Sequence, residues 1–171
     1  MSDLKDKVLL IGMPGCGKTT IGKLLATKLN YNFCDMDKYI EDISGETVKE
    51  LFEKGEENFR KWENKACVKL SKKRRVIISS GGGVIKNEKN IDLFREESII
   101  IFIDRPLDNI IEDVDIEKRP LLSSGKEKLY NIFQERYELY NKYCHIKIVN
   151  NGFLKDIIFE IQKELKERIR K

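Results

Sequence analysis

The chain has 171 residues, of which 40% are hydrophobic and 36% are Asp, Glu, Lys or Arg, and its formal net charge is +4. A chain of this length buries a hydrophobic core without disulfides or metal ions, so we expect a single domain over residues 1–171. Every apolar run is shorter than the roughly 20 residues that a membrane-spanning helix needs. We expect no membrane partner.

The N-terminal segment and the cysteines indicate a cytoplasmic protein. Residues 1–7 carry charge directly into a short apolar run, without the apolar stretch and cleavage site of a secretory signal. Cys16, Cys34, Cys67 and Cys144 are far apart and form no Cys-x-x-Cys pair, which argues against a disulfide framework or a zinc site. We predict reduced thiols.

The net charge suits an anionic substrate but does not by itself indicate nucleic-acid binding. The densest basic stretch, residues 72–75, has no interleaved aromatic residues and lies between a helical pattern and a strand. Such runs are common at solvated helix ends. We expect no nucleic-acid partner, and we predict a monomer.

Short apolar runs rich in Val and Ile alternate with longer helical patterns, which is typical of βαβ units that feed a parallel sheet. Nearly continuous Val and Ile favours strands that are covered on both faces. We therefore expect an α/β fold of three layers, α/β/α, with a five-stranded parallel sheet in the middle. The predicted strands are Lys7 to Ile11, Asn32 to Cys34, Val76 to Ser79, Ile99 to Ile103 and Ile146 to Val149.

Helical patterns lie between and after these strands. The first covers residues 18–29, and an insert at about 37–71 is interpreted as two or three helices broken at Ser44-Gly45 and at Gly55. Between Val114 and Gly125 the apolar periodicity lapses and breakers accumulate, so we interpret this segment as a mobile lid. Two further helices are predicted at about 126–143 and 153–170.

A glycine-rich motif follows the first predicted strand. Residues 12–19 match G-x-x-x-x-G-K-[ST] at every required position, and an amphipathic helical pattern follows directly. Such a loop turns backbone N–H groups toward phosphates at a helix N-terminus. It predicts an ATP site in which Lys18 bridges the β- and γ-phosphates and the Thr19 hydroxyl ligates Mg²⁺. The expected nucleotide contacts are Gly15, Cys16, Gly17, Lys18, Thr19 and Thr20.

Two carboxylates, Asp35 and Asp37, follow the second predicted strand. Ligands of open α/β folds bind at this edge of the sheet, and residues two apart on an extended segment share a face. Both carboxylates are therefore candidates for one site. The alternative is that Asp37 is the N-cap of a helix beginning near Lys38.

Three glycines and two arginines complete the candidate site. Residues 81–83 are all glycine, which disfavours regular structure and allows a ligand to approach the backbone closely, although a flexible turn is the alternative. Arg60 and Arg136 lie in helical patterns, where a lone Arg is usually solvated. A planar guanidinium is nevertheless the favoured partner of a substrate carboxylate.

The order of these motifs resembles that of shikimate kinases over nearly the whole chain. The resemblance implies a fold like that of nucleoside monophosphate kinases. It also implies transfer of the γ-phosphoryl group of ATP to the 3-hydroxyl of shikimate, on the route to aromatic amino acids. The shared features are the glycine-rich loop, the Asp-x-Asp, the Phe-Arg-x-x-Glu at 59–63, the Gly-Gly-Gly, the Arg-Pro-Leu-Leu at 119–122 and the Arg-x-x-x-Tyr at 136–140.

The same resemblance implies roles for individual residues. Asp37 would bind the hydroxyls of shikimate, Arg60 and Arg136 would hold its carboxylate, and Gly82 would contact it through the backbone. Asp37 is also the candidate that accepts the proton of the attacking hydroxyl, although phosphoryl transfer depends mostly on positioning and charge stabilisation. Arg119 resembles the lid arginine of the family and is expected to reach the β- and γ-phosphates on closure.

Two positions depart from a simple assignment. The run that ends in Asp104 resembles a Walker B strand, but in a kinase-like sheet the third strand lies beside the glycine-rich loop. We therefore assign the magnesium role to Asp35 together with Thr19. The family usually has an Arg packed on adenine seven residues before the lid Arg, whereas this chain has Glu112 there, which leaves the adenine contact open.

Two other functions remain open. The first is another small-molecule P-loop kinase, acting on gluconate or a nucleotide. A nucleotide kinase would favour further arginines for a second phosphate group, whereas Asp37 and the three glycines suit a polyhydroxylated acid. The second is a nucleotide-dependent regulatory module, which would bind ATP without turning over an acceptor.

Overall fold

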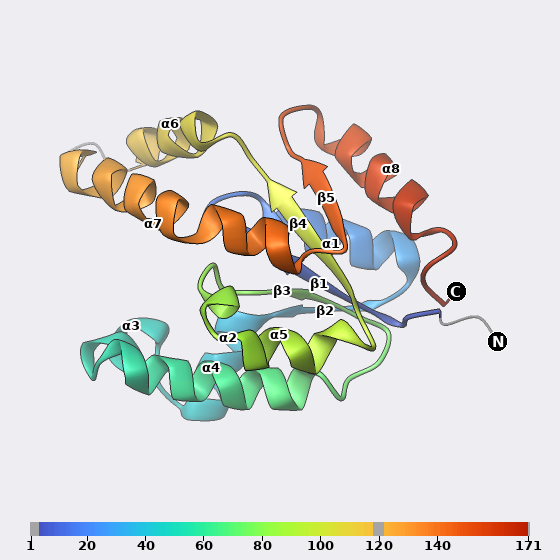
Figure 1. The fold of residues 1–171 in the computed structure, drawn as a ribbon, viewed down its shortest axis with the longest axis horizontal. Helices are drawn as coiled ribbons and strands as arrows, with labels where there is room; N and C mark the ends of the chain where they lie inside the picture. Colours follow the sequence, from blue (N-terminus) through green and yellow to red (C-terminus); the bar gives the residue numbers. More distant parts are fainter. Residues whose placement is uncertain (1–3, 118–121, 171) are drawn as a thin grey trace.

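A computed structural model describes the backbone of residues 4–117 and 122–170 and the side chains of residues 4–113 and 125–170. Its strands form one parallel sheet in the order β2-β3-β1-β4-β5 (Figure 1). The predicted bounds of β1, β3 and β5 are confirmed, and β2 and β4 are each one residue longer. The strands are β1 (Lys7–Ile11), β2 (Asn32–Asp35), β3 (Val76–Ser79), β4 (Ile99–Asp104) and β5 (Ile146–Val149).

Helices cover both faces of the sheet, which confirms the three predicted layers (Figure 1). On one face α1 packs against β1 to β3 and against α8. On the other face α5 and α7 pack against β4, and α4 packs against α5. The helices are α1 (Lys18–Leu29), α2 (Met36–Ser44), α3 (Val48–Glu53), α4 (Glu56–Leu70), α5 (Glu88–Arg95), α6 (Leu107–Glu117), α7 (Leu122–Tyr143) and α8 (Leu154–Leu165), with the 3₁₀ turn η1 at Val84–Lys86.

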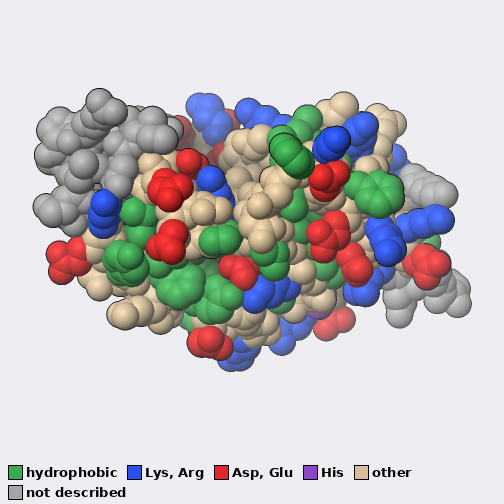
Figure 2. Space-filling model, turned by 90° about the horizontal axis from the view of Figure 1, so that it is seen from above, with side chains coloured by type: hydrophobic (Ala, Val, Ile, Leu, Met, Phe, Trp, Pro, Cys, Tyr) green, Lys and Arg blue, Asp and Glu red, His purple; other side chains and the backbone are tan. Residues whose placement is uncertain are grey.

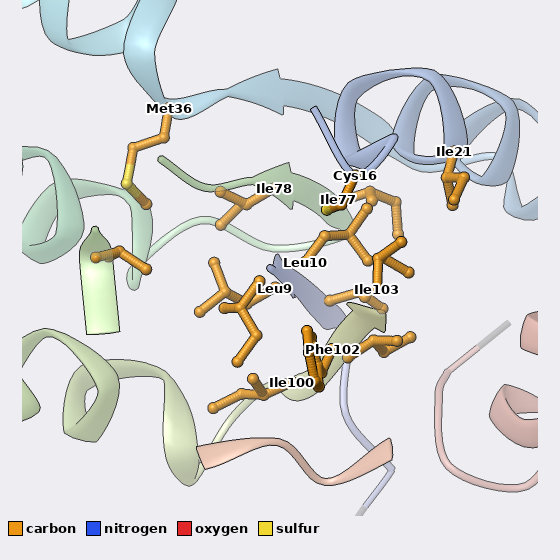
Figure 3. Close-up of a cluster of buried hydrophobic side chains, with 14 of the residues drawn as sticks. Leu9, Leu10, Cys16, Ile21, Met36, Ile77, Ile78, Ile100, Phe102 and Ile103 are labelled. Atoms are coloured by element: carbon orange, nitrogen blue, oxygen red, sulfur yellow. The ribbon is translucent and has the colours of Figure 1, made fainter. Parts of the chain in front are cut away.

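The core lies around the three central strands. Every residue of β1 and β3 is buried, and so are the first five residues of β4. Figure 3 shows side chains of these strands packed on one another, with the thiol of Cys16 entering the same cluster. The edge strands differ, because β5 alternates buried and exposed residues and β2 has no fully buried one. The prediction that the strands are covered on both faces is therefore confirmed for the three central strands and wrong for the edge strands β2 and β5.

The helical insert follows the predicted breaks. Gly45, at φ 75°, ends α2, and Gly55, at φ 109°, precedes α4. Backbone conformations with positive φ are those that glycine adopts without strain. Two helices outside the insert, α5 and α6, were not predicted, and the last helix is shorter than expected because it ends at Leu165.

The predicted lid is only partly described. Its first residues belong to the end of α6, and its last belong to α7, which begins at Leu122 rather than near residue 126. Arg119 lies outside the described residues. Among the helices that the structure describes, none is long and apolar enough to cross a bilayer. Acidic and basic side chains are mixed across the face seen in Figure 2.

Candidate active site

The glycine-rich loop leaves the end of β1 and leads into α1. Its backbone has positive φ at Gly15 (78°) and at Gly17 (102°), the residue that caps α1. A Cβ on Gly12 would lie 2.6 Å from the carbonyl oxygen of Ile103 on the neighbouring strand β4. The glycines of the motif are therefore required by backbone geometry and by close packing.

The Lys18 amine is folded back over this loop. Its Nζ donates to the carbonyl oxygens of Gly12 at 2.8 Å and Met13 at 2.9 Å, and the residue is only 8% exposed. The Cys16 thiol lies 3.6 Å from the same amine and is fully buried. Lys18 is thus held at the N-terminus of α1, where anions bind, while Cys16 belongs to the core.

A second support of the loop comes from the far end of the chain. Asn150, which follows β5, donates from Nδ2 to the carbonyl oxygen of Cys16 at 2.9 Å. Its own backbone N–H donates to the carbonyl oxygen of Asp104 at 2.8 Å. Asn150 therefore ties the glycine-rich loop to the ends of β4 and β5.

Thr19 and Asp35 lie together, as predicted for the magnesium site. The Thr19 hydroxyl donates to Asp35 Oδ2 at 3.1 Å and lies 3.2 Å from the Ser79 hydroxyl at the end of β3. Hard cations such as Mg²⁺ bind through one or two protein oxygens while water and phosphate oxygens complete the shell. The donor set fits such an ion. Among the described residues, no group of three or more His, Cys, Asp or Glu side chains is arranged around a metal.

The alternative role considered for Asp37 is wrong. Helix α2 begins at Met36, and its N-cap is Asp35, whose Oδ1 accepts from the Lys38 backbone N–H at 3.2 Å. Asp37 lies in the first helical turn rather than on an extended segment, so the shared-face argument from strand alternation is also wrong. The two carboxylates nevertheless line the same cavity, because the strand end and the first turn of the helix adjoin.

Two cavities meet beside Asp37. The first, of about 610 Å³, contains Lys18, Thr19, Thr20 and Asp35. The second, of about 600 Å³, extends to helices α4 and α7. Each is large enough for a small molecule. Both are lined by Pro14, Asp37, Gly81 and Gly82.

Asp37 presents an unpaired oxygen at this junction. Its Oδ1 is buried without a hydrogen-bond partner among the described residues, and a Cβ on Gly81 would come within 3.0 Å of it. Burial raises the pKa of Asp37, with a smaller contribution from the negative charge of Asp35, while Lys18 and Arg60 act in the opposite direction. A buried acceptor without a partner is typical of a ligand-binding position.

Arg60 is held by two carboxylates at the wall of the second cavity. Its Nη1 donates to both oxygens of Glu63, at 2.9 and 3.0 Å, and its Nη2 donates to Glu56 Oε1 at 3.1 Å. Glu63 is completely buried, and burial raises its pKa against the opposing charge of Arg60. A Cβ on Gly83 would overlap the guanidinium. The third glycine of the loop therefore leaves room for Arg60.

Arg136 reaches the same cavity from α7. Its Nε is buried without a partner among the described residues. One turn further along the helix, the Tyr140 hydroxyl donates to the Gly82 carbonyl oxygen at 2.5 Å, and its ring stacks on Phe102 of β4. This contact fixes α7, and with it Arg136, against the glycine loop.

Comparison with known proteins identifies the family. Residues 14–166 match the family model described as shikimate kinase. This chain belongs to the shikimate kinase family. A shikimate kinase from Clostridium beijerinckii is 54% identical over 166 residues, which cover 97% of this chain and 96% of the relative.

Solved shikimate kinases share the fold. The enzyme from Acinetobacter baumannii, in complex with shikimate, superposes with a TM-score of 0.86 at 29% identity and covers 98% of this chain and 97% of its own. The Aquifex aeolicus enzyme gives a TM-score of 0.82 at 34% identity, with 94% and 96% covered. The α/β fold inferred from the sequence is thus the fold of shikimate kinases.

Sequence reasoning named several of the residues that line the two cavities but gave no role to Glu63, Asn150 or Arg105. Glu63 was visible as the last residue of Phe-Arg-x-x-Glu, three positions after Arg60, which is the spacing of a helical ion pair. No sequence pattern around Asn150 or Arg105 indicates a role at the site. Arg105 lines the first cavity and donates to the carbonyl oxygen of Gly15 at 3.1 Å.

Proposed function

We propose that this chain transfers the γ-phosphoryl group of ATP to the 3-hydroxyl of shikimate, giving shikimate 3-phosphate and ADP, in the route to chorismate and the aromatic amino acids. The observation that carries the proposal is the junction of a phosphate-binding cavity and a second cavity at Asp37 and Gly82. A donor phosphate and an acceptor hydroxyl meet there, and phosphoryl transfer depends on such positioning.

The second cavity matches the chemistry of shikimate. Arg60 and Arg136 supply guanidinium groups for the single carboxylate of this acid, and a planar fork suits a carboxylate better than a point charge does. Asp37 and the backbone at Gly82 supply polar groups for the ring hydroxyls. The unpaired Oδ1 of Asp37 and the unpaired Nε of Arg136 are the two buried groups that such a ligand would satisfy.

The first cavity holds the donor. The backbone of Gly15, Cys16 and Gly17 and the residues that follow would receive the phosphates, with Lys18 exchanging its carbonyl partners for phosphate oxygens. Thr19 and Asp35 would hold Mg²⁺, Thr19 directly. When bound, the ion neutralises charge that accumulates on the phosphate oxygens.

Asp37 accepts the proton of the attacking hydroxyl in this proposal. The raised pKa of its carboxyl group makes it a better base than an exposed aspartate. Arg119, in the lid proposed at about 114–125, would add positive charge at the β- and γ-phosphates on closure and exclude water. We expect Arg119→Ala to lower kcat strongly while changing the KM for shikimate only slightly.

We further propose that the enzyme acts as a cytoplasmic monomer without a nucleic-acid or membrane partner. The mixed charges of the face in Figure 2 and the small net charge of +4 argue against a nucleic-acid partner. Elution of the purified chain at about twice the monomer mass at working concentration would argue against it.

A coupled assay of ADP release tests the function. Shikimate, gluconate and nucleoside monophosphates are offered separately, and shikimate alone should accelerate ADP release. Preference for gluconate or a nucleotide would assign the chain to another class of small-molecule kinase. ATP binding without acceleration by any acceptor would favour the regulatory module. Lys166→Ala, at an exposed position just after α8, is the control variant.

A further inference from the structure

Arg105 occupies the donor cavity without a role in the scheme above. It follows directly after β4, which pairs in parallel with β1 so that Ile11 lies opposite Phe102. The residue after β4 therefore lies beside the loop that follows β1. Pro106 comes next and precedes α6, and its carbonyl oxygen accepts from the backbone N–H groups of Asn109 at 3.1 Å and Ile110 at 3.3 Å.

Two acceptors hold the Arg105 guanidinium in place. Nη1 donates to the carbonyl oxygen of Gly15 at 3.1 Å and to Asp113 Oδ2 at 2.5 Å. Asp113 is on α6, whose Ile110 side chain would lie 3.2 Å from a Cβ on Gly15. The start of α6 and the glycine-rich loop are thus in contact. Arg105 links them.

The remaining donors of Arg105 are available to a ligand. Both of these hydrogen bonds use Nη1, and Nε and Nη2 have no partner among the described residues. The side chain is 24% exposed, whereas Asp113 is 55% exposed. A partly buried cation paired with one exposed carboxylate gains little from that pair alone. Its free edge suits a phosphate, which accepts two parallel N–H bonds from an arginine.

The charged side chains of the cavity also favour a phosphate-binding role for Arg105. Its described lining contains two cations, Lys18 and Arg105, and three carboxylates, Asp35, Asp37 and Asp113. A triphosphate adds several negative charges to this set. Of the described side chains that line the cavity, Lys18 and Arg105 are the two cations that could face these charges.

We propose that Arg105 is a second donor-side cation, which contacts the phosphate chain of the nucleotide while Asp113 holds it in position. The inference rests on the proposed function and adds a residue to its nucleotide site. It predicts that Arg105 contributes affinity for nucleotide and none for the acceptor.

Titration calorimetry with ADP in the absence of shikimate tests the inference. Wild type and Arg105→Gln are compared over a series of NaCl concentrations. We expect the Kd of the variant to rise about tenfold, the scale of a lost charge-assisted hydrogen bond. Salt screens ionic contacts. The plot of log Kd against log [NaCl] should therefore become less steep in Arg105→Gln and keep its slope in Arg105→Lys.

A residue that only supports the backbone of Gly15 would behave differently, because its loss would weaken binding at every salt concentration and leave the slope unchanged. Arg95→Gln is the matched control, since it removes a half-exposed arginine that pairs with Asp92 on α5 at 3.4 Å. That control should bind ADP as wild type does, and thermal melting establishes that each variant is folded.

The assay separates this inference from the function on which it rests. Wild type that binds ADP with the expected salt dependence but does not phosphorylate shikimate would overturn the proposed function and leave Arg105 as a phosphate ligand. An Arg105→Gln enzyme with unchanged Kd and slope, in a protein whose wild type phosphorylates shikimate, would overturn the inference alone. A raised Kd with an unchanged slope would also overturn it.

Discussion

The donor and acceptor sides of the cleft are built in different ways. The phosphate-binding part of the donor side is a continuous stretch, residues 12–20, whose backbone conformation is set largely by glycines and by the start of α1. The acceptor side gathers residues from α2, α3, α4, the 81–83 loop and α7. One local motif therefore suffices to recognise a nucleotide site, whereas the acceptor site exists only after these five separate segments have packed together.

The two sides also differ in their charges. Lys18 is bonded to neutral carbonyl oxygens, which phosphate oxygens replace without loss of a charged partner. Arg60 is bonded to the buried carboxylate of Glu63, so a substrate carboxylate has to share this guanidinium. The acceptor side, with the raised pKa values of Asp37 and Glu63, should consequently respond to pH more than the donor side does.

The largest expected effect comes from the donor side. In Lys18→Ala, kcat should fall about a thousandfold or more, because the variant lacks the charge nearest the transferred phosphate. The KM for shikimate should stay within a few-fold of wild type. Steady-state kinetics measure both values, and circular dichroism verifies the fold. Activity close to wild type in a folded Lys18→Ala protein would show that Lys18 does not stabilise the transferred phosphate and would contradict the assignment of the donor side.

Asp37→Asn should have the next largest effect, a loss of about a hundredfold in kcat, the range for removal of a general base. The pKa of Asp37 is raised by burial above its ordinary value of 3.8. Because the ionised form is the base, wild-type kcat should decline as the pH falls through this raised pKa. The acid limb of the kcat profile should be absent in Asp37→Asn. Asp42→Asn, at an exposed position of the same helix, is the control.

Arg60→Lys and Arg136→Lys should each raise the KM for shikimate about tenfold and leave the KM for ATP nearly unchanged, since a point charge cannot reproduce a bidentate carboxylate contact. Initial rates with each substrate varied in turn give both constants. A rise confined to the KM for ATP would place these arginines on the donor side.

Glu63→Gln should have the smallest kinetic effect, a rise of a few-fold in the KM for shikimate, because Glu63 acts only by orienting Arg60. Glu63→Gln should also change the pH dependence of protein stability, because the substitution removes a buried ionisable group. The folded-state pKa of Glu63 is raised above the ordinary 4.5, so the folded protein holds a proton there more tightly than the unfolded chain and its ionised form opposes folding at neutral pH.

The melting temperature of Glu63→Gln relative to that of wild type should therefore be higher at pH 7 than at a pH below the raised pKa. Thermal unfolding at several pH values measures this. Glu57→Gln, an exposed position on the same helix, should change neither quantity. A difference in melting temperature between Glu63→Gln and wild type that stays the same at every pH would contradict the sign derived from burial.

The contrast between the two sides also explains what the sequence could predict. Strand β1 and the loop after it follow from adjacent residues, and their bounds were predicted correctly. The start of α2 was not, because Asp35 and Asp37 are equally good caps by residue type and only the packed structure selects Asp35. The pairing of Arg60 with Glu63 lay within one helical turn and was within reach of sequence reasoning. Helix α6 was also within reach of sequence reasoning, because apolar residues at positions 107, 110, 111 and 114 follow the helical spacing.

Other features depend on contacts between distant segments. Arg105 contacts Gly15, which is 90 positions away in the sequence, and no local sequence pattern predicts such a contact. Residues of this kind are the ones that the sequence left unassigned.

The hydrogen bond from Asn150 to the Cys16 carbonyl oxygen spans 134 positions, and this separation bears on how the protein matures. Chains are synthesised from the N-terminus, and segments near it begin to fold first. The glycine-rich loop leaves the ribosome early, but Asn150 can bind it only after β5 has been made and added to the sheet. An unfinished chain therefore carries the complete nucleotide motif without the contact that fixes its shape. Competence to hold ATP should accordingly appear late in synthesis, once nearly the entire polypeptide has emerged.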